Sequence, residues 1–347
     1  MPGRARSLVA AVGRTGVLFA LSLALIFPGQ GSQSVGMGQA LASASPEAAE
    51  VWQVADEALE EPISGLAWEG PVDRLDLTVN AQPALLAASV AAYRALRAAA
   101  GHAGHAPGAV RPSHLAGHSM GQYSAMVATG VLGLEDALRL VRERGRLMQA
   151  ASDDGAMAAI IGLEGVREPE LVAAGEAHGV LTVANRNSPG QIVISGQHAA
   201  VQAAVGAARE LGARRAVMLP VSVAAHSPLM EEAAEGMRRA LADVGLREPA
   251  HPLLANADGS LLTTAEACRA ELIEHLTRGV DWVAAVDRMQ QAGVSTLLEV
   301  GPGRVLTSLV KRIVPDARSI AFDDLVSPGG VDLAPVTAPA SLDRAQE

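Results

Sequence analysis

The feature that most constrains the fold is a serine between two glycines, in the run Gly117-His118-Ser119-Met120-Gly121. A short apolar stretch precedes it, and an alanine-rich run typical of a helix, residues 124–131, follows it. This order is typical of a nucleophile elbow, a sharp strand-to-helix turn that presents the serine hydroxyl at its apex. Glycines suit such a turn because no Cβ fits beside it. The pattern predicts an α/β fold with Ser119 as nucleophile, although it also occurs by chance in glycine-rich loops.

Composition narrows the class of protein. The chain has 347 residues, of which 49% are hydrophobic, many of them alanine, and 2% are aromatic. These values predict a helix-rich α/β protein larger than one small domain. The net charge of −10 argues against a nucleic-acid partner. The single cysteine, Cys268, rules out an internal disulfide and suits a reducing compartment, so we expect a cytoplasmic protein.

The N-terminus allows two interpretations. Three arginines, Arg4, Arg6 and Arg14, precede the apolar run 16–26, as in a signal peptide. No Ala-x-Ala-like cleavage site follows, and residues 22–27 can equally form a first buried strand. We favour the strand, with residues 1–21 as an extension outside the fold. The run is too short to span a bilayer, so no membrane partner is expected.

A change of pattern near residue 154 predicts an inserted unit. Residues 154–221 follow the order strand, helix, strand, strand, helix, strand, which is typical of a ferredoxin-like (βαββαβ) subdomain. Its expected strands are 156–163, 180–185, 191–195 and 215–221, and its expected helices are 168–178 and 198–211. Elsewhere we expect helices at 47–59, 81–100, 134–151, 228–244, 265–276, 282–292 and 305–314, and strands at 223–226, 253–256 and 296–300. Residues 323–347 are predicted to form a C-terminal tail.

The serine needs a base, and nine histidines are candidates. His226 follows the apolar run 221–225 directly before a predicted helix, and strand ends are where α/β proteins gather catalytic groups. From position alone it could equally be a hydrogen-bonded core histidine. His118 is expected to point away from the site. His102 and His105 lack cysteine or carboxylate companions, so no metal site is predicted.

The loop after the first expected strand, residues 27–38, combines glycines, a proline and polar side chains. It lacks the Gly-Lys-Ser/Thr of a phosphate-binding loop. A glutamine fixed there, such as Gln30, could donate its amide N–H to a ligand.

Seven segments together carry a family resemblance, and they span about residues 23–320. The chain resembles the malonyl-CoA:acyl-carrier-protein transacylases of fatty-acid synthesis and the related acyltransferase domains of polyketide synthases. The segments, in the family's order, are 26–33, 117–124, 144–149, 156–162, 185–191, 221–230 and 299–303. We accordingly expect an α/β hydrolase-like core with a parallel sheet, residues 22–153 and 222–322, and the ferredoxin-like subdomain at 154–221.

The resemblance also implies roles for individual residues. Ser119 is the acylated nucleophile and His226 is its base and later acid. The Gln30 side chain and the Met120 N–H form the oxyanion hole. Arg144 binds the free carboxylate of malonate, a task that suits a planar guanidinium with its bidentate fork.

Two further residues, Asn187 and His275, complete the expected substrate-binding set. In the family a backbone carbonyl at the position of His275, instead of an acid, orients the catalytic histidine. The family usually has leucine, glutamate, glutamine and proline where this chain has Met120, Gln122, His275 and Gly279. The change at Gln122 removes a charge from the expected start of the helix.

The activity that the resemblance implies is ping-pong transfer of a malonyl group. Malonyl-CoA would acylate the serine, CoA would leave, and the phosphopantetheine thiol of acyl carrier protein would attack the ester. No metal or other cofactor is expected. Alternatives are a trans-acting acyltransferase that serves a polyketide synthase, a serine hydrolase that passes the acyl group to water, and a non-catalytic module that binds carrier protein. Carrier proteins are acidic, and the basic residues expected to bind one are Arg209, Arg214, Arg215, Lys311 and Arg312.

Overall fold

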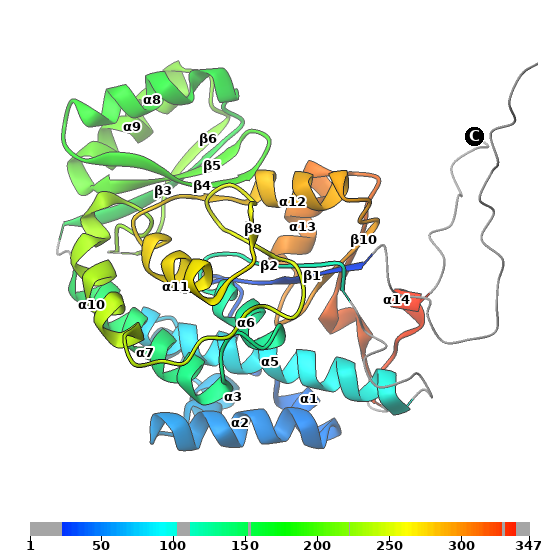
Figure 1. The fold of residues 1–347 in the computed structure, drawn as a ribbon. Helices are drawn as coiled ribbons and strands as arrows, with labels where there is room; N and C mark the ends of the chain where they lie inside the picture. Colours follow the sequence, from blue (N-terminus) through cyan, green and yellow to red (C-terminus); the bar gives the residue numbers. More distant parts are fainter. Residues whose placement is uncertain (1–22, 103–111, 152–153, 222, 328–329, 338–347) are drawn as a thin grey trace, which may run out of the picture.

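A six-stranded sheet forms the centre of the protein (Figure 1). The computed structural model describes residues 23–102, 112–151, 154–221, 223–327 and 330–337. The sheet has the order β11-β10-β1-β2-β7-β8, and all neighbours are parallel except the last pair. Its strands are β1 (Leu23–Phe27), β2 (His114–Gly117), β7 (Leu253–Leu254), β8 (Leu261–Leu262), β10 (Thr296–Glu299) and β11 (Arg318–Ala321). The predicted mixed α/β architecture with a parallel sheet is confirmed.

Helices cover both faces of this sheet, as the alternation of side chains along β1 shows. Leu23, Leu25 and Phe27 belong to the larger apolar core, whereas Ala24 and Ile26 belong to a second core on the opposite face. The larger core is built with α2 (Pro46–Leu59), α5 (Thr78–His102), α6 (Gly121–Ala128), α7 (Leu134–Ala150), α10 (Glu231–Leu241) and α11 (Ala265–Glu274). The second is built with α12 (Trp282–Gln291) and α13 (Val305–Ile313). Because both faces are covered, β1 is apolar throughout.

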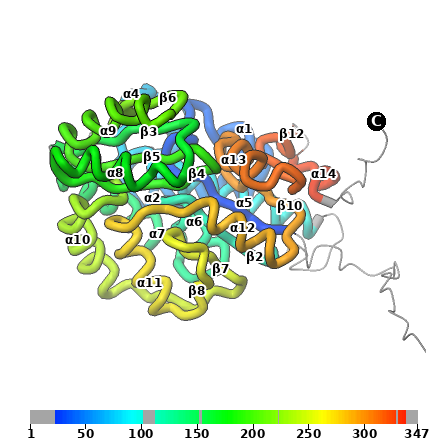
Figure 2. Tube along the Cα trace, turned by 90° about the horizontal axis from the view of Figure 1, so that it is seen from above, coloured from blue at the N-terminus to red at the C-terminus, as the bar shows by residue number. Residues whose placement is uncertain are grey.

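A second, five-stranded sheet lies above the first in Figure 1, with two helices on its outer face. Its order is β6-β3-β5-β4-β9, antiparallel except for the pair β4 and β9. The strands are β3 (Gly155–Ile161), β4 (Leu181–Ser188), β5 (Gln191–Gln197), β6 (Arg215–Met218) and β9 (Val280–Asp281), and the helices are α8 (Glu168–Glu176) and α9 (His198–Glu210). Along the chain, β3 to β6 follow the predicted βαββαβ order. Strand β4 lies beside α12 and α13, which joins this sheet to the first (Figure 2).

Three differences from the sequence-based predictions concern the secondary structure of residues 215–230. Residues 223–226 form no strand, because His226 has a φ of 60° and the Ser227 hydroxyl donates to the Ala224 carbonyl, which closes a turn. Strand β6 ends before Pro220, which cannot donate a ladder hydrogen bond. The helix expected from residue 228 begins as a 3-10 turn at Pro228–Met230 and continues as α10.

Further differences concern short elements and the chain ends. Helix α5 begins one turn before the predicted residue 81, so Pro83 lies inside it. Part of the predicted tail is folded, because Leu325 is buried in the larger core and the short strand β13 (Gly330–Val331) lies beside α5. Elements that the sequence patterns did not predict include α1 (Gln39–Ala44), α3 (Ile63–Glu69), α4 (Val72–Leu75), β8, β9, β11, the hairpin β12 (Val326–Ser327) and β13 (Gly330–Val331), and α14 (Ala334–Thr337). The predicted extension 1–21 and His105 lie outside the described residues.

Candidate active site

The predicted elbow stands at the carboxyl end of β2. Strand β2 ends at Gly117, helix α6 begins at Gly121, and Ser119 between them has a left-handed φ of 52°. A Cβ at Gly117 would collide with the backbone of Gly121, and a Cβ at Gly121 would collide with the Phe27 carbonyl. The glycines are therefore required by close backbone approach, and the strained serine is held by its surroundings.

The base candidate reaches this serine from a distant segment. The Ser119 hydroxyl donates to His226 Nε2 at 2.8 Å. On the other side of the ring, His226 Nδ1–H donates to the carbonyls of His275 at 2.6 Å and Arg278 at 3.0 Å. Two carbonyl acceptors fix the tautomer in which Nε2 carries the lone pair. The ring is thus oriented to take a proton from Ser119 without a carboxylate beside it.

The electrostatic surroundings keep this imidazole neutral. His226 is 3% exposed, and burial, followed by the nearby charge of Arg144, lowers its pKa to about 3. The two carbonyl acceptors act in the opposite direction but do not offset burial. At neutral pH the ring is therefore in the form that can accept a proton.

Arg144 places a buried positive charge next to Ser119. Its side chain extends from α7 and is 1% exposed, and its Nη2–H donates to Ser119 Oγ at 3.3 Å. In the part of the chain that the structure describes, no carboxylate pairs with it and its Nε has no hydrogen-bond partner. Burial lowers the pKa of the guanidinium, but an arginine stays charged. A buried, unpaired cation is costly, so the position is suited to an anionic ligand.

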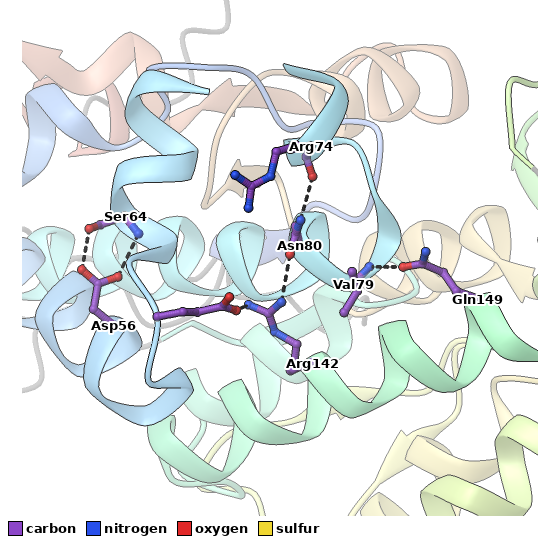
Figure 3. Close-up of polar contacts among 8 residues, drawn as sticks. Asp56, Ser64, Arg74, Val79, Asn80, Arg142 and Gln149 are labelled. Atoms are coloured by element: carbon purple, nitrogen blue, oxygen red, sulfur yellow. Dashed lines mark hydrogen bonds and ion pairs between the residues drawn. The ribbon is translucent and has the colours of Figure 1, made fainter. Parts of the chain in front are cut away.

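Helix α7 is held firmly against the start of α5. Arg142 Nη1–H donates to Asn80 Oδ1 at 2.8 Å, and the Val79 N–H donates to Gln149 Oε1 at 2.8 Å (Figure 3). Between these two contacts, a Cβ at Gly145 would clash with the Val79 backbone. The close approach of the two helices at Gly145 fixes the position of the neighbouring Arg144 relative to Ser119.

The two expected oxyanion donors differ in how they are held. Gln30 follows β1 on an exposed loop, and its Nε2–H donates to Thr78 Oγ1 at 3.2 Å. A primary amide has two N–H groups, so one remains for a ligand. The Met120 N–H at the start of α6 donates to no other described residue. Both groups line the cavity that contains Ser119.

This cavity of about 430 Å³ lies between the two sheets. The parallel-sheet side contributes Gln30, Ser119, Met120, Arg144 and His226, among others. The five-stranded sheet and the residues just after it contribute Met157, Asn185, Asn187, Val193 and Leu219. The cavity therefore has the charged and reactive groups on one wall and a mixture of apolar side chains and two amides on the other, which suits a small ligand with one charged end.

Two expectations about histidines need correction. His118 was expected to point away, but it lines the cavity, and its Nε2 hydrogen bonds to Asn187 Oδ1 at 2.9 Å. Asn187 belongs to β4 of the second sheet, so this hydrogen bond links the elbow to the opposite wall of the cavity. His275 was grouped with the substrate-binding residues, yet its ring is buried and does not line the cavity. Its backbone carbonyl accepts the His226 Nδ1–H, as the resemblance implies for this position.

Sequence reasoning missed two residues that hold the elbow. Asn256 Oδ1 accepts the Ser119 N–H at 2.8 Å. Gln122 is fully buried, where its Oε1 accepts the Gly117 N–H at 3.1 Å and its Nε2–H donates to the Leu254 carbonyl at 2.9 Å. An amide can do both, whereas a carboxylate could donate only when protonated, so the change from the usual glutamate fits this site. Asn256 was recognisable as the polar residue that follows the apolar strand β7.

The described residues contain no group of three or more histidine, cysteine or acidic side chains placed to hold a metal ion. Within the same ranges, no helix has the length and apolar character needed to cross a membrane.

Comparisons with known proteins agree with this geometry. The Acyl transferase domain family matches residues 24–329. The malonyl CoA-acyl carrier protein transacylase of Haemophilus influenzae is 42% identical over 89% of this chain and 97% of its own length. That of Bacillus subtilis is 38% identical over 93% of this chain and 99% of its own. The chain also matches 24% of the polyketide biosynthesis protein ThaF of Burkholderia thailandensis, at 38% identity.

Solved structures give the same result. An acyl carrier protein S-malonyltransferase from Vibrio cholerae superposes with a TM-score of 0.81 at 41% identity, covering 86% of this chain and 96% of that one. A malonyl-transacylase solved in complex with a type II polyketide synthase acyl-carrier protein superposes with a TM-score of 0.79 at 40% identity, covering 86% and 94%.

Proposed function

Because this chain belongs to the acyltransferase family of malonyl-CoA:acyl carrier protein transacylases, we propose that Ser119 accepts malonyl from malonyl-CoA and passes it to acyl carrier protein. The resemblance found in the sequence is confirmed by these matches. The chain is an acyltransferase, and we propose fatty-acid synthesis as the process that it supplies.

One observation carries the choice of a malonyl group. Arg144 is a buried cation without a carboxylate partner among the described residues, and its Nη2 lies 3.3 Å from Ser119 Oγ. In a malonyl thioester, one methylene group separates the carboxylate from the carbonyl that Ser119 would attack. A guanidinium beside the nucleophile can bind that carboxylate while the carbonyl lies over the serine.

The first half-reaction follows from the hydrogen bonds at Ser119. His226 Nε2 takes the hydroxyl proton as Ser119 Oγ attacks the thioester carbonyl, and the Met120 N–H and the Gln30 amide stabilise the oxyanion. The tetrahedral intermediate collapses with loss of the CoA thiolate, which takes the proton back from the imidazolium. The carbonyls of His275 and Arg278 stabilise the imidazolium that exists in between.

The second half-reaction repeats this chemistry with another thiol. His226 deprotonates the phosphopantetheine thiol of the carrier protein, whose sulfur attacks the malonyl ester, and Ser119 leaves with the proton. The serine, histidine and oxyanion donors supply every proton and charge needed, so the proposed reaction uses no metal and no cofactor. Asn187 is proposed to contact the substrate through the cavity that it lines.

A polyketide carrier protein is the second candidate acceptor. The match to ThaF and the superposition on the transacylase complexed with a polyketide carrier protein favour it. The chemistry at Ser119 would be unchanged, so only the carrier would differ.

We also propose the finer description of the fold. The parallel order of β1, β2 and β10 with the elbow after β2 supports a hydrolase-like core, at residues 22–153 and 222–322. The βαββαβ order and the antiparallel arrangement β6-β3-β5-β4 support a ferredoxin-like subdomain at 154–221. The lone, buried Cys268 supports a cytoplasmic location.

The proposed docking surface for the carrier lies beside the cavity. Its members are the exposed basic residues Arg209, Arg214 and Arg215 near β6, and Lys311 and Arg312 at the end of α13. Helix α13 itself lines the cavity through Leu306 and Leu309. Positive side chains on this rim would attract an acidic carrier and direct its phosphopantetheine arm inward.

Intact mass spectrometry tests the proposal. Protein mixed with malonyl-CoA should gain one malonyl group, Ser119→Ala should gain none, and Arg144→Ala should lose malonyl but retain some reaction with acetyl-CoA. Methylmalonyl-CoA measures the tolerance for an α-methyl group. Thioester consumption without any adduct would instead support the hydrolase alternative.

A further inference from the structure

A buried carboxylate near the nucleophile has no role in the proposed chemistry. Glu271 lies in the last turn of α11 and is 9% exposed. Burial raises the pKa of its side chain, and no cation in the described ranges forms an ion pair with it. Burying an acidic group without a cation costs free energy, so the hydrogen bonds that compensate for its burial indicate what the group does.

Those hydrogen bonds all go to one residue. Glu271 Oε1 accepts the Asn256 backbone N–H at 2.7 Å and the Asn256 Nδ2–H at 3.0 Å. An amide whose NH₂ group is fixed in this way must direct its oxygen the opposite way. That oxygen, Asn256 Oδ1, accepts the Ser119 N–H at 2.8 Å. A chain of hydrogen bonds therefore runs from α11 to the backbone of the nucleophile.

We propose that Glu271, acting through Asn256, is a positioning residue for Ser119. Ser119 has a left-handed φ of 52°, a conformation that costs free energy in a residue with a side chain and needs outside support. The hydrogen bond to its N–H supplies support at the strained residue itself. This inference rests on the proposed malonyl transfer through Ser119.

Helix α11 would then set both partners of the catalytic pair. Glu271 and His275 lie one turn apart at its end, and the His275 carbonyl accepts the His226 Nδ1–H at 2.6 Å. One turn of helix thus holds Ser119 through the side chains of Glu271 and Asn256, and it holds His226 through a backbone carbonyl. A small displacement of either group would lengthen the 2.8 Å hydrogen bond between Ser119 and His226.

The test measures the rate of malonyl-enzyme formation in a single turnover at saturating malonyl-CoA. Glu271→Ala should lower this rate by about 10- to 100-fold, with the Kd for malonyl-CoA unchanged, because the nucleophile is misplaced while the binding groups remain. Glu271→Gln should retain the rate, because its amide oxygen can accept the same two hydrogen bonds. Cys268→Ala is the matched control, since this residue is buried on the same helix and contacts neither Asn256 nor Ser119 through a hydrogen bond.

A double-mutant cycle separates positioning from general stability. In an Asn256→Ala background, Glu271→Ala should cause almost no further loss of rate, because the path to Ser119 is already broken. If Glu271→Ala does not fold, Glu271→Asp withdraws the carboxylate from Asn256 and serves in its place. A folded Glu271→Ala with the full rate, losses that multiply in the double variant, or equal losses in Glu271→Gln and Glu271→Ala would overturn the inference. Failure of the unsubstituted protein to form the adduct would instead overturn the proposed function.

Discussion

The two walls of the cavity are built in different ways. The core wall, Ser119, Arg144 and His226, is joined by hydrogen bonds of 2.8 and 3.3 Å. The sheet wall has three apolar side chains and two amides, and one of these amides, Asn187, hydrogen bonds to His118; its members are Met157, Asn185, Asn187, Val193 and Leu219. Under the proposed function, the core wall would determine the rate and the choice of a charged acyl group, while the sheet wall would determine cavity shape and access.

The largest effect is expected from the charge on the core wall. Arg144→Ala should lower kcat/KM for malonyl-CoA by about 10²- to 10⁴-fold, since two charge-assisted hydrogen bonds would be lost. Reaction with acetyl-CoA, which has no carboxylate, should change far less. Steady-state rates with both thioesters measure the ratio, and Arg144→Lys is the control that keeps the charge without the fork. Equal losses for both thioesters would show that Arg144 holds Ser119 instead of the carboxylate.

The oxyanion donor on the loop should have the next largest effect. Gln30→Ala should lower kcat by about 10²- to 10³-fold, because one donor to the developing oxyanion is removed. Gln30 is exposed, so the change should leave the melting temperature nearly unaltered. Thr78→Val, which removes the acceptor of the Gln30 amide, should give a smaller loss in the same direction. A kcat that is insensitive to Gln30→Ala would leave the Met120 N–H as the main donor.

The acid limb of the pH profile tests the electrostatics of the core wall. His226 must be neutral to accept the proton, and its pKa of about 3 predicts no loss of kcat/KM near 6.5, the ordinary histidine value. Arg144→Gln removes a charge that lowers this pKa, so the acid limb should move to higher pH. Acetyl-CoA is the substrate for both proteins, and an NMR titration of His226 checks the assignment. An acid limb near 6.5 in both proteins would contradict the account.

The same pKa has a consequence for stability. Because the folded pKa of His226 is lowered, the unfolded chain binds more protons between pH 3 and 6.5. The contribution of His226 to the free energy of unfolding is therefore complete above about 6.5 and is lost as the pH falls towards 3.

The smallest effect is expected on the outer side of the sheet wall. Charge reversal by Arg214→Glu with Arg215→Glu should raise the KM for carrier protein severalfold and leave the KM for malonyl-CoA unchanged, since both residues are exposed, belong to the proposed docking surface and do not line the cavity. Added salt should reduce the difference between the variant and the unsubstituted protein. Unaltered carrier kinetics would remove these arginines from the docking surface.

Features that depend on residues close together in the sequence could be predicted, whereas features that depend on contacts between distant segments could not. The elbow was predictable because Gly117, Ser119 and Gly121 determine it locally. The position of His226 after an apolar run marks it as a candidate base, although the residues expected to form a strand form a turn. Patterns with helical or strand period marked every long element, whereas β8 and β9, two residues each, are too short to show a period.

The supports of the site could not be predicted in the same way. The position of Asn256 after an apolar strand marks it as a candidate site residue, but it lies 137 positions from Ser119, and no motif shows that its amide accepts the Ser119 N–H. Gln122 showed only a lost charge in the sequence, and the partners that explain an amide there appear when β2 and β7 become neighbours. Such residues depend on the assembled sheet.

The most direct test of the central claim is the fate of the malonyl group on the isolated malonyl-enzyme. Protein freed of CoA is mixed with holo-acyl carrier protein, with the apo form that lacks the phosphopantetheine thiol, or with buffer alone, and each species is followed by mass. The account predicts rapid transfer to the holo carrier and a stable ester in the other two mixtures. Release of free malonate at the same rate in all three would contradict transfer and identify a hydrolase.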